Sequence, residues 1–426
     1  MISEKIYGKL IALLREIKLQ KSSNIGCFPS SFLIGNVGLE WWYTKKSYKE
    51  CNDLSKMIIT SNKNFVNCDY EYFSRVIINT IQNNGFNKEL FNPDLVFKSK
   101  IDNLLEASNQ SDYKTLSKKL YSIIENKLQS TITDWMVLYP VSSLKSDTFV
   151  FESLDLVLLS SDDKTYWQNV SYDYKSSFGF NPTNGQNYAM NIIPAAYKVP
   201  STWLIFKTNG TENGTIRKMK FNIKEFIACI CSFNITSSES FPNYIENETP
   251  RYCILFPGNN VVDFNLRINS LPFLQPSFAS NFEVSVETLK EVDSYIKSIN
   301  SLAIESRKRF ETATQFIHYG LLASSDIERF MHFYIALDAL FGEKKNVKET
   351  IKSGLLTIKD IEPHIEDKAD KLFNLRNEIL HGGSSIIEDS KYYEKYLEKY
   401  EINPLADIEL ICYKSIKSYV KFVKKI

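Results

Sequence analysis

The sequence carries almost no net charge and has no long hydrophobic run. Its 51 lysines and arginines are matched by 50 aspartates and glutamates, which leaves a net charge of +1 over 426 residues. No field of one sign therefore attracts nucleic acid to the whole chain, and any RNA contact would need a local basic patch. The longest apolar run, around residues 226–231, is far shorter than the ~20 residues that cross a bilayer. We therefore expect no membrane contact.

Cysteine is sparse and unpatterned. The chain has seven, an odd number, at positions that form neither a disulfide framework nor a zinc motif: Cys27, Cys51, Cys68, Cys229, Cys231, Cys253 and Cys412. Cys229 and Cys231 lack a second ligand pair at zinc spacing, so we expect no metal site and no other cofactor. The first residues are typical of a polar-interrupted amphipathic helix and not of a signal peptide. These features predict a cytoplasmic protein.

The chain also lacks the short motifs of several common enzyme classes. It has no Gly-Lys-Ser/Thr phosphate loop, no dinucleotide-binding glycine pattern and no Gly-x-Ser-x-Gly nucleophile turn. We therefore exclude a nucleotide hydrolase, a dehydrogenase or an esterase built on those motifs. Hydrophobic residues make up 43% of the chain and aromatic residues 13%, which is enough apolar material for two or three domains with their own cores.

Hydrophobic periodicity predicts an α+β protein with three regions. Residues 1–134 should form a mainly helical N-terminal region, because two apolar stripes recur there at helical spacing. The stripes are Ile6, Leu10, Leu13, Leu14 and Ile17, and Leu116, Leu120, Ile124 and Leu128. Residues 135–284 should form an antiparallel β-rich domain, a candidate sensor or specificity domain. Residues 285–426 should form an all-α helical bundle.

Alternating patterns and turn signals locate the expected elements more closely. Strands are expected at residues 154–158, 203–206, 252–256 and 262–268, the last with apolar and polar residues in strict alternation. Asn-Gly pairs such as Asn213-Gly214 are typical of loops. Helical spacing resumes at Glu287, where apolar residues up to Ala303 predict one long helix running toward Gly320.

Residues 373–383 hold the strongest candidates for chemistry. Arg376 interrupts the apolar stripe of a predicted helix, and His381 follows at its end, just before the stop signal Gly382-Gly383. The stripe consists of Leu372, Phe373, Ile379 and Leu380. A buried guanidinium is normally paired or used, so Arg376 should meet an acidic side chain or an external anion. The carbonyls of the last turn favour a protonated His381. An arginine and a titratable imidazole at one helix end are the groups that phosphodiester cleavage needs.

An upstream segment gives this element its context. Residues 326–342 predict a helix with Phe330, Tyr334, Leu337 and Phe341 on one face and Asp338 at its border. The phrase Arg329-Phe330, followed by Ala336-Leu337-Asp338-Ala339-Leu340-Phe341 and then by Leu375-Arg376-Asn377 and His381-Gly382, resembles the HEPN superfamily in its Apea-like branch. The resemblance covers roughly the last third of the chain.

The resemblance implies a helical bundle that forms a homodimer and brings two Arg-Asn-x-x-x-His elements into one metal-independent, RNA-cleaving cleft. Arg376, Asn377 and His381 are then the catalytic residues. Asp338 supports them, at a position where the branch often has glutamate. The implied function is that of an endoribonuclease in bacterial anti-phage defence or growth arrest, an abortive-infection toxin, with a phage-derived activator acting on the N-terminal or middle domain.

Other interpretations of the same residues stay open. A HEPN module can bind RNA or a partner without cutting, or it can serve only to dimerise. Arg376 can be a core ion-pair partner of Asp338 or Glu378. Asn377 can cap the helix end, or position phosphate or His381.

The remaining basic and histidine residues carry weaker hypotheses. Lys414, Lys417 and Lys421 follow one side of the last predicted helix and form either a solvated face or a contact to the RNA backbone. The other three histidines, His318, His332 and His364, are expected to be structural, because histidines on helix faces usually satisfy local hydrogen bonds.

Overall fold

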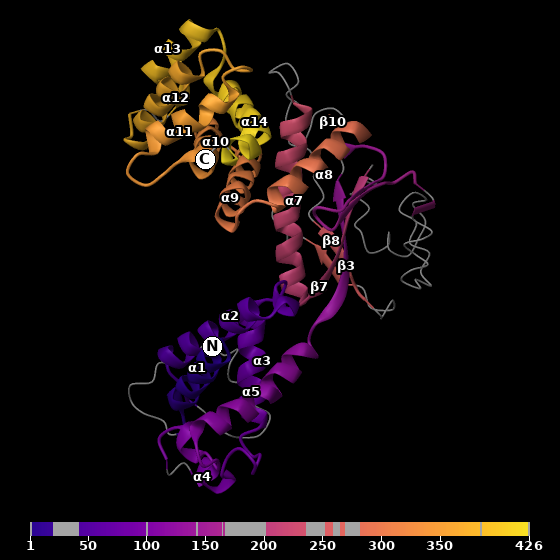
Figure 1. Ribbon diagram of the computed structural model, residues 1–426, viewed down its shortest axis with the longest axis vertical. Helices are drawn as coiled ribbons and strands as arrows, with labels where there is room; N and C mark the ends of the chain where they lie inside the picture. Colours follow the sequence, from indigo (N-terminus) through magenta and orange to yellow (C-terminus); the bar gives the residue numbers. More distant parts are fainter. Residues whose placement is uncertain are drawn as a thin grey trace. The chain divides into compact units, whose positions relative to one another are not determined.

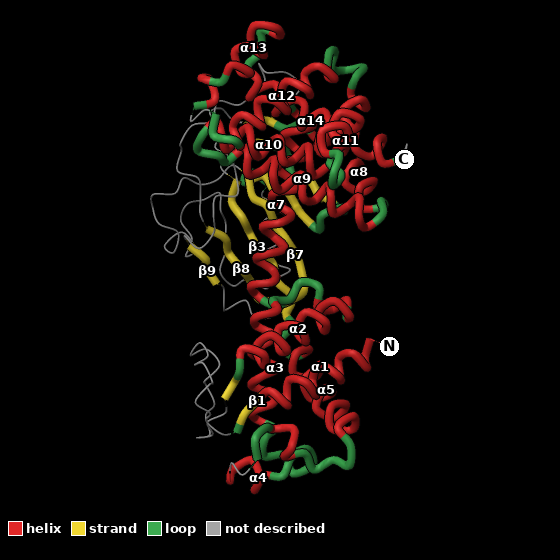
Figure 2. Tube along the Cα trace, turned by 90° about the vertical axis from the view of Figure 1, so that its left-hand side faces the viewer, coloured by secondary structure: helices red, strands yellow, loops and turns green. Residues whose placement is uncertain are grey.

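The computed structural model describes residues 2–19, 42–98, 101–141, 144–163, 165–166, 202–235, 252–258, 265–268, 282–383 and 386–424. The chain divides into two compact units. Unit 1 comprises Met1–Trp135 and Thr208–Lys218, and unit 2 comprises Met136–Lys207 and Met219–Ile426. Helices dominate the N-terminal and C-terminal regions, and strands lie between them in sequence (Figures 1 and 2). The predicted α+β class is therefore confirmed.

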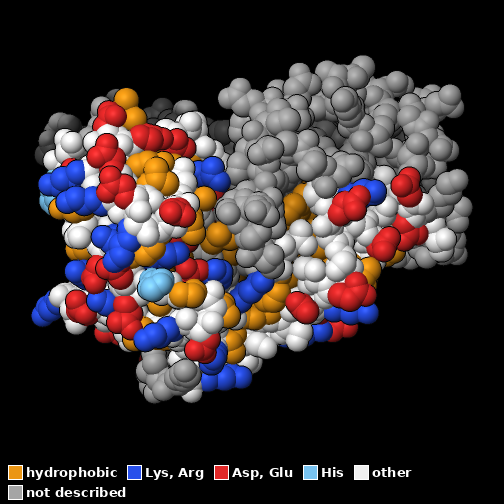
Figure 3. Space-filling view, turned by 90° about the horizontal axis from the view of Figure 1, so that it is seen from above, with side chains coloured by type: hydrophobic (Ala, Val, Ile, Leu, Met, Phe, Trp, Pro, Cys, Tyr) orange, Lys and Arg blue, Asp and Glu red, His pale blue; other side chains and the backbone are white. Residues whose placement is uncertain are grey.

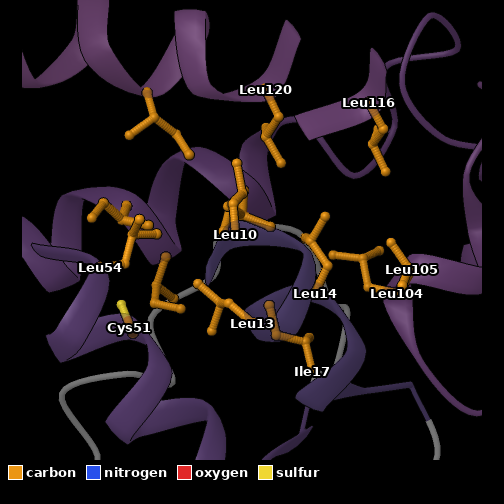
Figure 4. Packing of buried hydrophobic residues seen from close by; sticks show 14 of the residues in the cluster. Leu10, Leu13, Leu14, Ile17, Cys51, Leu54, Leu104, Leu105, Leu116 and Leu120 are labelled. Carbon is orange, nitrogen blue, oxygen red and sulfur yellow. The ribbon is translucent and has the colours of Figure 1, made fainter. Parts of the chain in front are cut away.

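Unit 1 is built from helices with a two-stranded sheet. The helices are α1 (Ile2–Glu16), α2 (Lys45–Ser61), α3 (Tyr70–Asn83), α4 (Pro93–Lys98) and α5 (Tyr113–Gln129), with 3-10 helices η2 (Lys63–Phe65) and η3 (Leu104–Ala107). Strand β1 (Ile17–Lys18) pairs antiparallel with β2 (Trp42–Tyr43). The two predicted apolar stripes face one common core, in which Leu10 and Leu14 of α1 lie near Leu116 and Leu120 of α5 (Figure 4). This helical prediction is confirmed.

The Asn213-Gly214 pair was predicted to mark a loop, and this prediction is wrong. Both residues lie in the first turn of α7 (Glu212–Asn234). Gly214 is needed there for close packing, because a Cβ atom at this position would lie 2.0 Å from the carbonyl oxygen of Asn67. Arg217 of the same helix donates to the carbonyl of Cys68 at 2.8 Å. The glycine thus serves a close backbone approach and not a turn.

Unit 2 contains the central sheet. Its strands lie in the order β5-β6-β7-β3-β8-β9. They are β3 (Thr133–Val141), β5 (Phe149–Phe151), β6 (Leu156–Ser160), β7 (Thr202–Gly210), β8 (Tyr252–Pro257) and β9 (Asn265–Ile268), and β4 (Leu144–Lys145) pairs separately with β10 (Phe282–Glu283). The pairs β5–β6, β6–β7 and β8–β9 are antiparallel. Strands were predicted at all of β6 to β9; residues 262–264 of the last prediction lie outside the described residues.

The middle region also holds a long helix that the sequence did not predict. The apolar run at residues 226–231 belongs to α7, which packs on the sheet (Figures 1 and 2). The ring of Phe226 lies 5.4 Å from that of Phe151 on β5. Asn222 donates to the carbonyl of Leu154 at 2.9 Å. A short apolar run has the same appearance in a buried strand and a buried helix, which explains the error.

The C-terminal region of unit 2 is a helical bundle. It consists of α8 (Val286–Asn300), α9 (Ile304–Leu321), α10 (Asp326–Phe341), α11 (Val347–Leu355), α12 (Ile365–Leu380), α13 (Lys391–Tyr400) and α14 (Pro404–Val423), with 3-10 helices η5 (Leu356–Ile358) and η6 (Ile387–Asp389). The single long helix predicted from Glu287 is wrong, since α8 and α9 are separate. Ser301 ends α8 by donating to the Lys297 carbonyl, and Ala303 has extended backbone, so the apolar stripe stops at Ile299.

Buried charges link the helices of the bundle. The Lys368 ammonium on α12 lies 2.5 Å from Glu362 and 2.6 Å from Asp407 on α14. All three side chains are almost completely buried. Arg329 on α10 forms a salt bridge with the fully buried Glu409 on α14. Because an unpaired buried charge is costly, these ion pairs fix which helix faces meet.

Two further observations concern the chain as a whole. No helix in the described ranges combines the length and the apolar character that crossing a membrane requires. The six cysteines that the structure describes are buried and form no disulfide: Cys51, Cys68, Cys229, Cys231, Cys253 and Cys412.

Candidate active site

The Arg-Asn-x-x-x-His element occupies the C-terminal end of α12. The helix ends at His381, and Gly382 adopts a left-handed backbone with φ of +74°. The amide of Gly383 donates to the Glu378 carbonyl at 2.9 Å, and that of Gly382 donates to the Ile379 carbonyl at 3.2 Å. These two bonds form a Schellman motif, which needs glycine at the left-handed position. The predicted stop signal at Gly382-Gly383 is therefore confirmed.

Arg376 is half-buried and held on two sides. Its guanidinium carbon lies 5.7 Å from the centre of the Tyr334 ring on α10. Its Nη1 donates to the side-chain oxygen of Asn377 at 3.0 Å. Its buried Nε has no hydrogen-bond partner among the described residues. A guanidinium placed in this way is oriented by an aromatic face and an amide and keeps donors for an anion.

Asp338 does not form the predicted ion pair. Within the described part of the chain, no salt bridge of 4.0 Å or less joins it to Arg376. Burial raises the pKa of the Asp338 carboxyl, and the charges of Arg376 and Arg309 act in the opposite direction. Its Oδ1 lies so close to Gly342 that a Cβ atom there would stand 1.7 Å away. Asp338 therefore acts on Arg376 only through a longer-range charge interaction.

Glu378, the other proposed partner of Arg376, is engaged elsewhere. Its carboxylate accepts a hydrogen bond from the hydroxyl of Ser390, the N-cap of α13. This contact joins the end of α12 to the start of α13. The alternative in which Arg376 is only a core ion-pair residue therefore loses both of its proposed acidic partners, and the anion that the guanidinium would meet must come from outside the described residues.

His381 lies at the surface. Its backbone amide donates to the Asn377 carbonyl at 3.0 Å, while its side chain is exposed. No hydrogen bond to its ring is formed within the described ranges, so the imidazole is held only by the fixed helix end. The predicted apolar stripe is not buried along its whole length, since Leu372 is buried but Leu380 is 50% exposed. The prediction that Leu380 belongs to a buried face is thus wrong.

His318 and His332 occupy packed positions, whereas His364 is exposed at the start of α12 and has a left-handed backbone. The His332 ring lies 5.7 Å from that of Tyr319 and 6.0 Å from that of Phe316. Burial lowers the pKa of His332, against a smaller opposing effect of Glu328. His318 is completely buried in α9. The packing of both rings fits a structural role, while the buried Nδ1 of His332 has no hydrogen-bond partner among the described residues.

The three candidate RNA-binding lysines have different surroundings. Lys414 pairs with Glu362, so its charge belongs to the buried network of α12 and α14. The Lys417 ammonium lies 5.2 Å from the Phe233 ring and donates to the Phe233 carbonyl at 3.4 Å. Lys421 is exposed. Lys417 and Lys421 both line an open groove between α8 and α14, together with Lys424, which lies three residues further along the chain.

Acidic and basic side chains are interspersed over the face shown in Figure 3, which matches the balanced net charge. Across the residues that the structure describes, no group of three or more histidine, cysteine, aspartate or glutamate side chains is placed to hold a metal ion.

Comparisons with known proteins give no match: no family model, no curated protein and no solved structure is similar to this chain. The candidate site therefore depends on the residues themselves. The sequence located Arg376, Asn377 and His381 at one helix end, and the structure brings the first two into direct contact. The sequence missed Tyr334 as a site residue, because its place on an apolar helix face had the appearance of core packing alone.

Proposed function

We propose that the chain is an endoribonuclease that cuts RNA without a metal ion, through attack by the 2′-hydroxyl of the RNA. One observation carries this proposal: Arg376 is oriented by Tyr334 and Asn377 but keeps donors for an anion, and His381 stands in water at the end of the same helix. The resemblance of residues 329–382 to the HEPN superfamily supports the same activity.

The side chains of the element match the tasks of the reaction. RNA supplies its own nucleophile, so the protein must remove a proton from the 2′-hydroxyl, stabilise the charge on phosphorus and protonate the departing 5′-oxygen. The planar fork of Arg376 suits a phosphate, which it binds through two parallel hydrogen bonds. His381 suits both proton transfers, because an imidazole ring has one nitrogen that can accept a proton and one that can donate it. DNA should resist cleavage, since it lacks the 2′-hydroxyl.

The proposal includes a dimer. One element offers one imidazole, whereas cleavage with both a base and an acid uses two, so the site should lie across a two-fold axis. Leu380 is 50% exposed and Ile386 is 55% exposed, and these apolar side chains flank His381 in sequence. Burial of both against a second protomer would remove apolar surface from water at the position where the two histidines must meet.

A second candidate function is a HEPN module that binds RNA or a partner without cutting. The observation that favours it is the solvent-exposed His381, whose ring has no hydrogen-bond partner among the described residues. Catalytic imidazoles are usually oriented by a second group. In the cleavage proposal, the partner protomer and the substrate supply that orientation.

The biological setting follows from the resemblance. We place the protein in the bacterial cytoplasm, as an anti-phage or growth-arrest toxin, and we propose that a phage-derived activator acts on the N-terminal or middle region. The division of the chain into two compact units is compatible with a separate sensing part.

The test is cleavage of total RNA by purified protein in excess EDTA, with wild type beside His381→Ala. Wild type should degrade RNA and the variant should not. Because His381 is exposed at a helix end, its replacement opens no cavity, so the variant should melt at the wild-type temperature. Cleavage that is equal in both proteins would reject His381 as the catalytic group. Binding without cleavage in both would favour the second candidate.

A further inference from the structure

An open groove of about 470 Å³ lies between α8 and α14. Its lining consists of Tyr295 and Ser298 from α8, and of Lys417, Val420, Lys421 and Lys424 from α14. Half of these residues are lysines and none is acidic. A protein with balanced overall charge thus has a local basic site, which is the condition that RNA binding imposes on such a chain.

The floor of the groove is rigid. The Tyr295 ring lies 5.2 Å from the Phe233 ring on α7 and 5.9 Å from the Phe310 ring on α9. Its hydroxyl donates to the carbonyl of Ile416 on α14. Because both the ring and the hydroxyl are engaged, Tyr295 serves as a fixed wall and does not present a free face for stacking a base.

Lys417 anchors the basic side of the groove. Its ammonium lies against the Phe233 ring and donates to the carbonyl of that residue at 3.4 Å. Burial lowers the pKa of Lys417, and the charge of Glu291 only partly opposes this effect. A half-buried ammonium whose desolvation is not offset by a direct salt bridge is stabilised when an anion arrives.

Lys421 and Lys424 extend the same row. The three lysines stand at i, i+4 and i+7, so they share one helix face over about 10 Å. Within the described residues, neither Lys421 nor Lys424 forms a salt bridge of 4.0 Å or less. Lys414, about one turn before Lys417, differs from them because it pairs with Glu362. Lysines in the last turn of α14 interact favourably with the negative end of the helix dipole. That effect does not explain why they line the same groove as Lys417.

We propose that this groove binds the phosphodiester backbone of an RNA strand, at a site distinct from the Arg376–His381 element. The inference rests on the proposed function in taking RNA as the substrate. The row of about 10 Å places three lysines along one line, an arrangement that can follow consecutive phosphates of a strand. The groove offers lysine charges and no free aromatic face, so it contacts phosphates, positions the strand and does not read its sequence.

The test is a binding titration of the full-length protein with a fluorescent single-stranded oligodeoxynucleotide. DNA carries the same phosphates but no 2′-hydroxyl, so binding is measured without cleavage. The groove variant is Lys421→Gln/Lys424→Gln. The matched control is Lys391→Gln/Lys395→Gln, which removes two exposed lysines from neighbouring turns of α13, at i, i+4 where the groove pair is at i, i+3.

The groove variant loses two phosphate contacts. Each contact contributes about 0.7 to the slope of log K against log salt for a single strand, so the loss of two should lower the affinity roughly 25-fold at about 0.1 M salt. The control should stay within about twofold of wild type. Equal weakening of both variants would mean a nonspecific charge effect, and an unchanged groove variant would mean that no strand binds there; either result overturns the proposal. Displacement of the probe by AMP at the same phosphate concentration would assign the groove to a mononucleotide and overturn it as well.

The RNA cleavage assay separates this inference from the proposed function. If no RNA is cut but the groove variant binds the probe more weakly than wild type, the groove proposal is supported and the nuclease proposal is rejected. If His381-dependent cleavage occurs and the groove variant binds normally, the nuclease stands and the groove is rejected.

Discussion

The Arg376 guanidinium faces the Tyr334 ring, with 5.7 Å between the guanidinium carbon and the ring centre. This contact joins α12, which carries the Arg-Asn-x-x-x-His element, to α10. Burial raises the pKa of the Tyr334 hydroxyl, so the ring stays neutral at physiological pH. A cation over an aromatic face of this kind contributes about 0.5–2 kcal/mol, and here it fixes the direction in which the arginine fork points.

Tyr334 should therefore act as a positioning residue for Arg376. Tyr334→Phe keeps the ring and should cut RNA at a rate close to that of wild type. Tyr334→Leu removes the ring and should lower kcat by about tenfold, the equivalent of ~1.4 kcal/mol. Single-turnover kinetics on a defined RNA, together with melting curves, would check this. If both variants lose activity only in proportion to lost stability, the residue is structural and does not position Arg376.

Asp338 should destabilise the folded protein at neutral pH, contrary to the ion pair that the sequence suggested. Burial raises the pKa of its carboxyl, with Arg376 and Arg309 opposing. A folded-state pKa above the unfolded value of about 3.9 means that the folded state binds the proton more tightly. The contribution of Asp338 to stability is therefore fully present below that value and is lost as pH rises through the raised pKa.

It follows that Asp338→Asn should raise the urea midpoint at pH 7, and that this gain should shrink as the pH falls toward 4. Urea titrations at both pH values would measure it. A lower midpoint at pH 7 would instead mean that the ionised carboxylate stabilises the bundle through Arg376 or Arg309.

The buried network around Lys368 should dominate the stability of the bundle. Lys368→Met leaves Asp407 without an ammonium partner and Glu362 with Lys414 alone, which should cost about 3–5 kcal/mol. The matched control is Lys395→Met, an exposed position on α13, which should change stability by less than about 0.5 kcal/mol. Denaturant unfolding would compare the two. Similar small effects in both variants would show that the network is not required.

The same network predicts acid sensitivity. Burial raises the pKa of Glu362, but the hydrogen bonds from Lys368 and Lys414 outweigh it, and the net effect lowers that pKa. Stability from Glu362 is therefore present above its unfolded pKa of about 4.3 and is lost as pH falls through the lowered folded value. Wild-type stability should decline in that acidic range, and Lys368→Met should show less of this decline.

Leu380 should contribute to the dimer and not to the fold of the protomer. Leu380→Glu places a charge on a side chain that is 50% exposed, so the melting temperature should change little. Sedimentation should show a shift from dimer to monomer, and RNA cleavage should be lost with it. Leu356→Glu, at a position that is 42% exposed on η5, is the control and should leave the dimer intact. A monomeric Leu380→Glu protein that cuts RNA at the full rate would contradict the shared site.

The sequence predicted an element correctly where its residue spacing allows only one structural interpretation. The stripes of α1 and α5 and the stop at Gly382-Gly383 follow from local spacing and from the backbone freedom of glycine. Gly214 shows the limit of that argument, because its glycine serves packing against Asn67 and not a turn. The break between α8 and α9 was not predictable, since no proline or glycine marks it.

The candidate site was predictable in part for similar reasons. A charged residue within an apolar stripe drew attention to Arg376, but one of the two partners of its guanidinium, Tyr334, lies on another helix. Tyr334 is indistinguishable from core packing until α10 and α12 are placed together. The lysines of α14 form a run that is visible in the sequence, but the opposite wall of their groove, Tyr295 and Ser298 of α8, is not. Contacts between helices distant in sequence carry no local signal.

The most direct test of the central claim is the chemistry of the cut ends. A defined RNA, cut by wild-type protein in excess EDTA, should yield 2′,3′-cyclic phosphate and 5′-hydroxyl ends, because the nucleophile is the 2′-oxygen next to the broken bond. A 2′-O-methyl group on that one nucleotide should abolish the cut, and Arg376→Ala or His381→Ala should abolish it in the unmodified RNA. Strict dependence on added magnesium, 3′-hydroxyl products or cutting at the methylated position would contradict the mechanism.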